Sequence, residues 1–136
     1  MEIKFCGKRL DNGEWAYGCL TRYSNHMSYI TVDLIENEVH EVLTATVGQF
    51  TNEKDDEQKD MYEGDVLAVE CPNCEETHIV VIERQGCTLC VDVCGEDYDT
   101  TAITWAIRLW DNYGADYKII GNIHEHPHLL EPNHAD

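Results

Sequence analysis

The chain has 136 residues, about the size of one domain, and 43% of them are apolar, enough for a hydrophobic core. Its 27 acidic residues against nine lysines and arginines give a formal net charge of −18. Proteins hold nucleic-acid phosphates and anionic membranes with clustered cations, so this charge disfavours direct binding to either. There is no run of about 18 apolar residues and no signal-like N-terminus. The seven cysteines, an odd number, therefore favour reduced thiols or a metal site in a cytoplasmic protein.

The first half of the chain predicts two β-hairpins. In the first, Asp11-Asn12-Gly13 separates two runs with strand character, because Asn-Gly accepts the positive φ angles of a tight turn. In the second, Glu36-Asn37-Glu38 separates two β-branched runs. The four predicted strands cover residues 3–10, 14–22, 29–35 and 39–43.

The middle of the chain predicts further strands. Residues 47–50 form a short apolar piece, and the charged stretch 52–60 predicts a solvated loop. Glu63-Gly64-Asp65 predicts a turn into a strand over residues 66–70. A third hairpin is expected around Arg84-Gln85-Gly86. It would join residues 77–83 to residues 87–93, with an acidic turn over 95–100.

A short helix is predicted over residues 102–112. Apolar side chains recur there at helical spacing, with Leu109 widening the buried face. Asp99 or Thr100 is the expected N-terminal cap, and Gly114 lies just beyond the end. A Trp-rich strand over 103–110 is the alternative. The residues that define the stripe are Ile103, Ala106, Ile107 and Trp110.

The end of the chain predicts a closing strand over residues 117–123 and then a polar tail, 124–136, with a helical turn near Leu129. Strand signals outnumber helix signals along the whole chain. We therefore expect a mainly β fold: a compact barrel- or sandwich-like sheet built from hairpins, with one short amphipathic helix. The absence of repeats and low-complexity linkers predicts a single domain over residues 1–136.

Four sequence blocks, spread in order over nearly the whole chain, form a recognisable pattern. They are Gly7–Trp15 with Tyr17-Gly18, Thr46–Thr51, Tyr62–Val66 and Ile120–Pro127. The pattern resembles the YopX family of small phage and prophage proteins. The resemblance implies a mainly β fold, an origin in a phage or prophage, and a biochemical role that is undefined. It brings no catalytic residues with it.

The strongest local chemical signal is a pair of cysteine motifs, Cys71-Pro72-Asn73-Cys74 and Cys87-Thr88-Leu89-Cys90, separated by twelve residues. Four thiolates can hold Zn²⁺ in a tetrahedron, and a two-residue spacer lets one turn present two sulfurs. A regular strand over 87–93 would instead point Cys87 and Cys90 to opposite faces, and the cysteines would then be small apolar fillers or reduced thiols. Both interpretations stay open. The predicted zinc ligands are Cys71, Cys74, Cys87 and Cys90, with His78 and Cys94 as spare ligands.

Other chemical motifs are weaker. His124, His126 and His128 alternate near the C-terminus, where such a cluster can take up nickel or zinc adventitiously or simply belong to a polar tail. The sequence has no Gly-rich phosphate loop, no nucleophile elbow and no local Cys/His pair. We therefore expect a protein that is not an enzyme.

Charge distribution carries most of the functional prediction. Residues 53–65 hold seven acids and two lysines, and residues 85–107 hold no lysine or arginine. Such an acidic face can occupy a basic cleft, whereas the alternative is that acidity only keeps the protein soluble. We expect an accessory protein that contacts a basic host or phage protein through this face. The alternative function is a zinc-stabilised binding module, related to nucleic acid despite the charge, in which the four cysteines organise a binding loop. Trp105 lies off the predicted helix stripe and would mark a contact surface if exposed, and exposed strand edges leave a homo-oligomer open.

Overall fold

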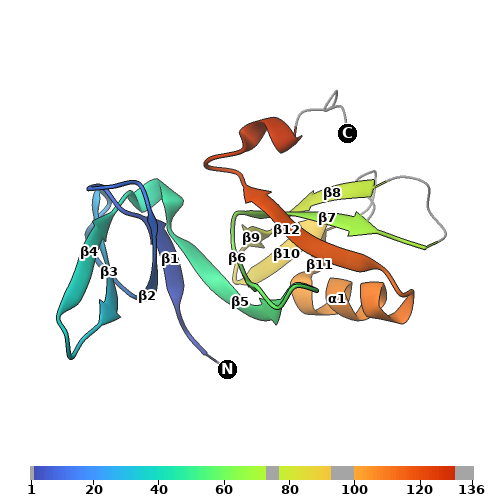
Figure 1. Ribbon diagram of the computed structural model, residues 1–136, viewed down its shortest axis with the longest axis horizontal. Helices are drawn as coiled ribbons and strands as arrows, with labels where there is room; N and C mark the ends of the chain where they lie inside the picture. Colours follow the sequence, from blue (N-terminus) through green and yellow to red (C-terminus); the bar gives the residue numbers. More distant parts are fainter. Residues whose placement is uncertain (1, 73–76, 93–99, 131–136) are drawn as a thin grey trace. The chain divides into compact units, whose positions relative to one another are not determined.

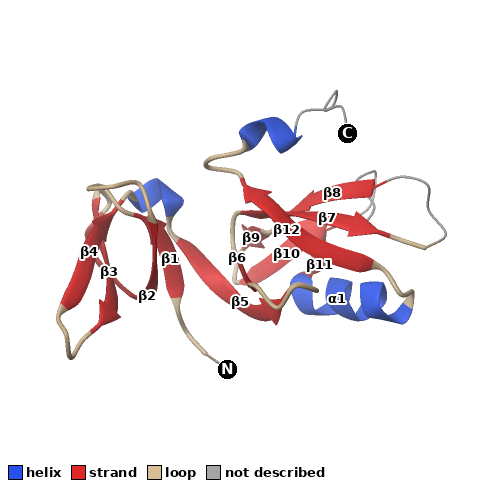
Figure 2. Cartoon of the chain, viewed as in Figure 1, coloured by secondary structure: helices blue, strands red, loops and turns tan. Residues whose placement is uncertain are grey.

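A computed structural model of the chain describes residues 2–72, 77–92 and 100–130 (Figure 1, Figure 2). The described chain falls into two compact units, Met1–Asn52 and Glu53–Asp136. A single domain over the whole chain stays a prediction. The expected acidic turn at 95–100 lies almost wholly outside the described residues, as do the last six residues of the expected tail.

The first unit is built from consecutive antiparallel strands, which are β1 (Phe5–Lys8), β2 (Trp15–Ser24), β3 (Met27–Asp33), β4 (Glu38–Val42) and β5 (Gly48–Lys54), with a 3₁₀ turn η1 (Thr44–Thr46). Their order in the sheet is β4-β3-β2-β1-β5. Both predicted hairpins are confirmed. The chain reverses at Gly13 and Asn37, whose φ angles of +74° and +56° suit Gly and Asn.

One face of this sheet carries the unit's hydrophobic cluster, formed by Ala16, Ile30 and Val42. A bridge between Arg9 and Val42 brings the β1–β2 turn against the end of β4. Gly7 permits this approach, because a Cβ there would lie 2.7 Å from Cγ2 of Val42. On the opposite face of β2, β3 and β4, the side chains of Tyr23, Met27 and Val39 are exposed.

The predicted solvated loop at 52–60 is partly wrong. Strand β5 runs to Lys54, and β6 (Asp60–Tyr62) follows it in the same sheet, so only the residues between them form a loop. Within that loop Asp55 is 1% exposed. The charged composition did predict exposure for most of the loop. It could not identify Asp55 as a buried carboxylate whose oxygens accept hydrogen bonds from backbone N–H groups.

The second unit contains two three-stranded sheets. One has the order β12-β7-β8 and the other β11-β10-β9. The elements are β7 (Asp65–Glu70), β8 (Thr77–Val81), β9 (Glu83–Gln85), β10 (Thr88–Asp92), β11 (Thr100–Ala102), α1 (Ile103–Asn112), β12 (Asp116–Asn122) and η2 (Pro127–Leu130). The predicted turn into β7, the closing strand and the helical turn near Leu129 are confirmed.

The third predicted hairpin is only partly correct. The expected strand over 77–83 pairs backward with β7 rather than forward with β10. The chain leaves that strand at Ile82, whose N–H donates to the carbonyl of Asp65. Only the short β9 then pairs with β10, around a turn that includes Cys87. A strand pattern alone does not say which neighbour the strand pairs with, and this explains the error.

The predicted helix is confirmed as α1, and the alternative strand is wrong. Its N-cap is Ala102, with no side-chain hydrogen bond; Thr100 lies in β11, and Asp99 lies outside the described residues. Leu109 does not widen the buried face, since its side chain is 39% exposed. The helix ends as expected at Gly114, which has φ +70° and lets Ala115 N–H donate to the Trp110 carbonyl.

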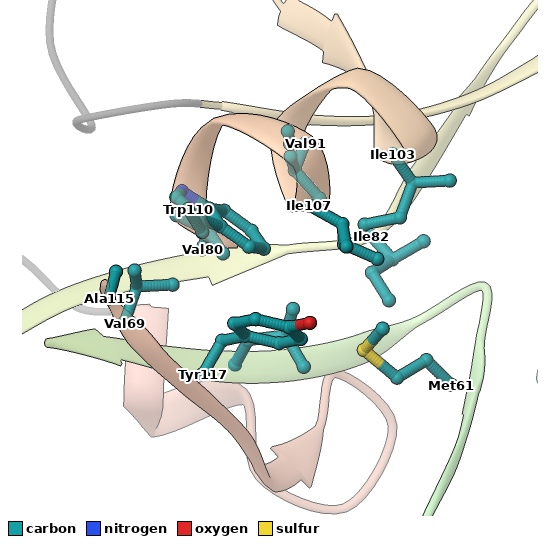
Figure 3. Packing of buried hydrophobic residues seen from close by; sticks show 12 residues of the cluster. Met61, Val69, Val80, Ile82, Val91, Ile103, Ile107, Trp110, Ala115 and Tyr117 are labelled. Carbon is teal, nitrogen blue, oxygen red and sulfur yellow. The ribbon is translucent and has the colours of Figure 1, made fainter. Parts of the chain in front are cut away.

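The core of the second unit lies between α1 and the strands (Figure 3). Trp110 and Tyr117 meet there with ring centroids 5.3 Å apart. The hydrophobic cluster of this core consists of Met61, Leu67, Val69, Val80, Ile82, Val91, Ile103, Ala106, Ile107, Trp110, Ala115 and Tyr117.

The predicted fold class is confirmed as mainly β and sandwich-like, without closure of the sheet into a barrel. None of the helices in the described residues has the length and apolar character needed to cross a membrane.

Candidate functional site

The outer side of α1 carries large side chains where a surface helix ordinarily presents polar ones. Trp105 is 65% exposed, which confirms that it lies off the buried stripe. Leu109, four residues on, lies on the same side of the helix, and Tyr113, the C-cap residue of α1, is also exposed. The Arg108 guanidinium lies 5.5 Å from the Trp105 ring centroid. We call Trp105, Arg108, Leu109 and Tyr113 the α1 surface. Three of these residues, Trp105, Arg108 and Leu109, border an open groove of about 600 Å³ together with Thr101 and Asn112.

A group of carboxylates lies beside the α1 surface. The Tyr117 hydroxyl donates to Oδ1 of Asp111 at 3.1 Å. Burial, this hydrogen bond and the charges of Asp111, Asp56 and Glu53 all raise the pKa of Tyr117. Burial and then the charge of Asp111 also raise the pKa of Glu53, which Arg108 opposes. All three carboxylates thus act on Tyr117, and we call Glu53, Asp56 and Asp111 the acidic cluster.

A second group of carboxylates anchors the loop between β5 and β6. Oδ1 of Asp55 accepts hydrogen bonds from the N–H groups of Glu57 and Lys59, both at 2.9 Å. Oδ2 accepts from the N–H of Ile119 in β12 at 3.0 Å. Its neighbour Asp56 accepts from the Tyr117 N–H at 2.8 Å. The two aspartates therefore bind the backbone of β12, and they place the acidic cluster next to α1.

Asp65 has a strongly raised pKa among the described carboxyl groups of this unit. Burial, the largest cause, and the negative charge of Asp55 together raise its pKa to about 7, against a hydrogen bond from the Tyr62 N–H that lowers it. That bond, to Oδ2 of Asp65, measures 2.8 Å. Asp65 also pairs with Asn122 across the sheet. Its position among backbone groups indicates a structural role.

Two of the sequence blocks that carry the family resemblance meet in the second unit. Gly64 lies in the turn before β7 with φ +97°, a conformation that favours glycine. Its carbonyl accepts from Ile123 N–H at 2.9 Å, and its N–H donates to the Ile82 carbonyl at 2.8 Å. A Cβ on Gly64 would lie 3.3 Å from Nε2 of His124. The residues of these two blocks therefore build the junction between the start of β7 and the end of β12.

The histidines predicted to lie in a polar tail belong in part to this junction. The Asn122 side chain accepts hydrogen bonds from the N–H groups of His124 and Glu125, at 3.0 and 2.9 Å. Nδ1 of His126 accepts from the Asn122 N–H at 3.3 Å. The rings of His126 and His128 meet edge to face, 6.1 Å apart. The first residues of the expected tail are thus folded onto β12.

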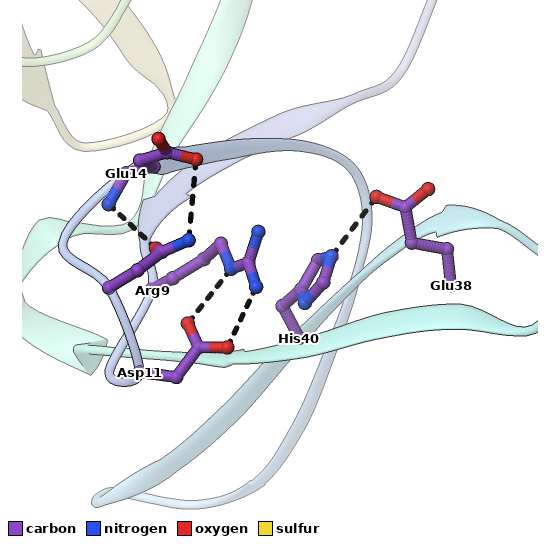
Figure 4. A network of polar contacts seen from close by, with 6 residues as sticks. Arg9, Asp11, Glu14, Glu38 and His40 are labelled. Atoms are coloured by element: carbon purple, nitrogen blue, oxygen red, sulfur yellow. Dashed lines mark hydrogen bonds and ion pairs between the residues drawn. The ribbon is translucent and has the colours of Figure 1, made fainter.

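The first block builds a polar network around the β1–β2 turn (Figure 4). Arg9 donates from Nε and Nη2 to the two oxygens of Asp11, at 2.9 and 2.7 Å. This hydrogen bonding raises the pKa of Arg9 and lowers that of Asp11. Nearby, Nε2 of His40 lies 3.0 Å from Oε2 of Glu38. Because these pairs face water, they shape the turn and contribute little stability.

The predicted zinc ligands occupy different environments. Cys71 packs against the core of the second unit, and Cys90 is buried in β10, where its Sγ lies 3.7 Å from the Thr88 carbonyl. Cys87 is exposed in the turn before β10, not in a regular strand. Cys74 lies outside the described residues. Among the residues that are described, no three His, Cys, Asp or Glu side chains are grouped as metal ligands. The four-cysteine zinc site stays a prediction.

Elemental analysis tests that site directly. If the four thiolates bind zinc, protein purified without chelator holds about one zinc per chain, and a chelator unfolds part of the chain. Replacing Cys71 and Cys74 together by serine should remove the metal. Replacing Cys19, an exposed cysteine of β2, should not. Zinc-free protein with an unchanged unfolding curve in chelator would contradict the prediction.

Comparison with known families identifies the chain. The family model described as YopX protein matches residues 4–131, nearly the whole length. The chain belongs to the YopX family. A comparison of this YopX protein with curated proteins finds no match. The matched range includes both units, and membership suggests a small phage-type protein of undefined function.

Part of the candidate surface was not predicted from the sequence. The apolar stripe predicted a buried Leu109, and Tyr113 lies beyond the predicted helix. The signal was present, since residues 105, 109 and 113 repeat at intervals of four. Asp55 had no such signal, because one of its two oxygens binds the backbone of Ile119, 64 residues away.

Proposed function

We propose that this YopX protein is a non-enzymatic accessory protein of a phage or prophage that binds a basic protein of the host or phage. The binding surface is the α1 surface together with the acidic cluster. The observation that carries the proposal is the exposed stripe of Trp105, Leu109 and Tyr113 next to three carboxylates. The formal net charge of −18 is consistent with it.

The two parts of the surface have different physical roles. Large aromatic side chains dominate interface energetics, so Trp105 is the expected anchor of the contact. The carboxylates attract a basic partner over a distance and speed its association, an effect that salt screens. The Arg108 guanidinium lies over the Trp105 ring, where it can help to orient the indole, and its charge also favours the ionised form of Glu53.

The test is a pull-down from host cells that carry the active phage, with and without nuclease treatment of the lysate. We expect one basic protein in both lysates. Recovery should fall about tenfold or more for Trp105→Ala, whereas thermal unfolding should stay within a few degrees of the parent because the side chain is mostly exposed. Thr104→Ala, an exposed change elsewhere on α1, is the matched control.

Salt separates the steering role from the anchoring role. The association rate should fall steeply between about 50 mM and about 500 mM salt, and Asp56→Asn should reduce that dependence. An association rate that does not change with salt concentration would contradict recognition through the acidic cluster. Equal recovery by Trp105→Ala and the parent would contradict the assignment of the α1 surface.

A further inference from the structure

The first unit presents a second surface, on the side of its sheet away from the core. The lining side chains come from three neighbouring strands and are Thr21, Tyr23, Met27, Tyr29, Thr31 and Val39. They border an open groove of about 530 Å³, within the size range of ligand sites. Strand pairing aligns side chains in two rows that cross β2, β3 and β4 in that order. One row is Thr21, Tyr29 and Glu41, and the other is Cys19, Thr31 and Val39.

This groove is aromatic and exposed. Tyr23 is 72% exposed and meets Tyr29 edge to face, with centroids 5.4 Å apart. Met27 and Val39 are 43% and 42% exposed on the same face. The core of this unit lies on the other face of the sheet, and an exposed apolar patch of this kind marks interaction sites.

The charge around the groove selects its occupant. None of the described residues that line it is a lysine or arginine, and Glu41 lies on the same face, directly across from Tyr29. Tyrosine rings attract cations over their faces, and the methylene stems of lysine and arginine pack on apolar surface. A second copy of this acidic chain would bring more carboxylates to Glu41. A basic extended segment brings the complementary charge.

We propose that the outer face of β2, β3 and β4 binds an extended lysine- or arginine-containing segment of a protein. The inference rests on the proposed function for the class of partner, a basic protein, and adds a second surface with its own recognition chemistry. The cationic heads lie against Tyr23, Tyr29 and Glu41. The aliphatic stems and neighbouring apolar side chains lie against Met27 and Val39.

A synthetic peptide of about ten residues that alternates arginine and valine is the probe, with the same peptide carrying glutamate for arginine as its control. In an NMR titration of the full chain, we expect saturable amide shifts confined to β2, β3 and β4 for the basic peptide. Tyr23→Ala should weaken binding about tenfold, and Tyr23→Phe should retain it, because the ring supplies the contact. Val32→Ala, on the opposite face of β3, should leave affinity unchanged.

Other outcomes overturn the inference. Shifts confined to the α1 surface would reject this second site but agree with the proposed function. Equal binding of the acidic peptide would show that charge does not select the occupant. Concentration-dependent shifts of the same strands without any peptide, with a dimer in sedimentation, would assign the face to a second copy of the chain.

Discussion

Asp55→Asn is expected to destabilise the second unit by about 3 kcal/mol, the largest loss that we predict for a single carboxylate. The side chain is 1% exposed, and its two oxygens accept from Glu57, Lys59 and Ile119. An asparagine can keep one acceptor oxygen, but its NH₂ group then faces a backbone N–H. A buried donor left without an acceptor costs about 1 to 3 kcal/mol, and the charged hydrogen bonds are lost as well.

Chemical denaturation at pH 7 measures this loss. Asp56→Asn is the matched control on the same loop, because asparagine can still accept from the Tyr117 N–H and position 56 is exposed. We expect it to change the free energy of unfolding by less than about 1 kcal/mol. Equal losses for the two variants would contradict the assignment of Asp55 as the anchor of β12.

Local pattern predicted the elements of this protein well. Asn12-Gly13 identified the first hairpin because the φ angle of Gly13 belongs to few residue types. The stripe ending at Trp110 identified α1 because its apolar residues repeat at the helical period. These signals depend on residues close in sequence, and they were read correctly for that reason.

Pairing between distant segments could not be predicted. The run 77–83 has the same alternation whether it pairs with β7 or with β10, and only the packed fold decides between them. The burial of Asp55 depends likewise on Ile119. For the candidate site, Trp105 could be placed on the outside of the helix from its spacing, whereas the hydrogen bond between Asp56 and the Tyr117 N–H joins residues 61 positions apart and depends on the fold.

Asp65 is expected to make stability fall as pH rises toward neutrality. Its pKa is raised from the ordinary 3.8 to about 7, so between these values the folded state holds a proton that the unfolded state has released. Unfolding then takes place with loss of a proton, and a higher pH favours it. The contribution is fully present below about pH 4, declines up to about pH 7 and is absent above.

Between about pH 5.5 and about pH 8 this single group should lower the free energy of unfolding by about 2 kcal/mol, since one pKa unit corresponds to about 1.4 kcal/mol. Asp65→Asn removes the titration while keeping an oxygen for the Tyr62 N–H, so its unfolding free energy should be flatter over this range. Asp116→Asn, at an exposed position of β12, should retain the slope of the parent. A parental slope in Asp65→Asn would contradict the assignment.

The coupling between the two buried carboxylates gives a stricter test. The charge of Asp55 contributes to the raised pKa of Asp65, so Asp55→Asn should shift the Asp65 transition to lower pH. NMR titration of the Asp65 carboxyl carbon in parent and variant measures this shift directly. Because burial is the larger cause, the pKa should stay above 3.8 in the variant. An unchanged titration would mean that the two carboxylates do not interact, and burial alone would then account for the raised pKa.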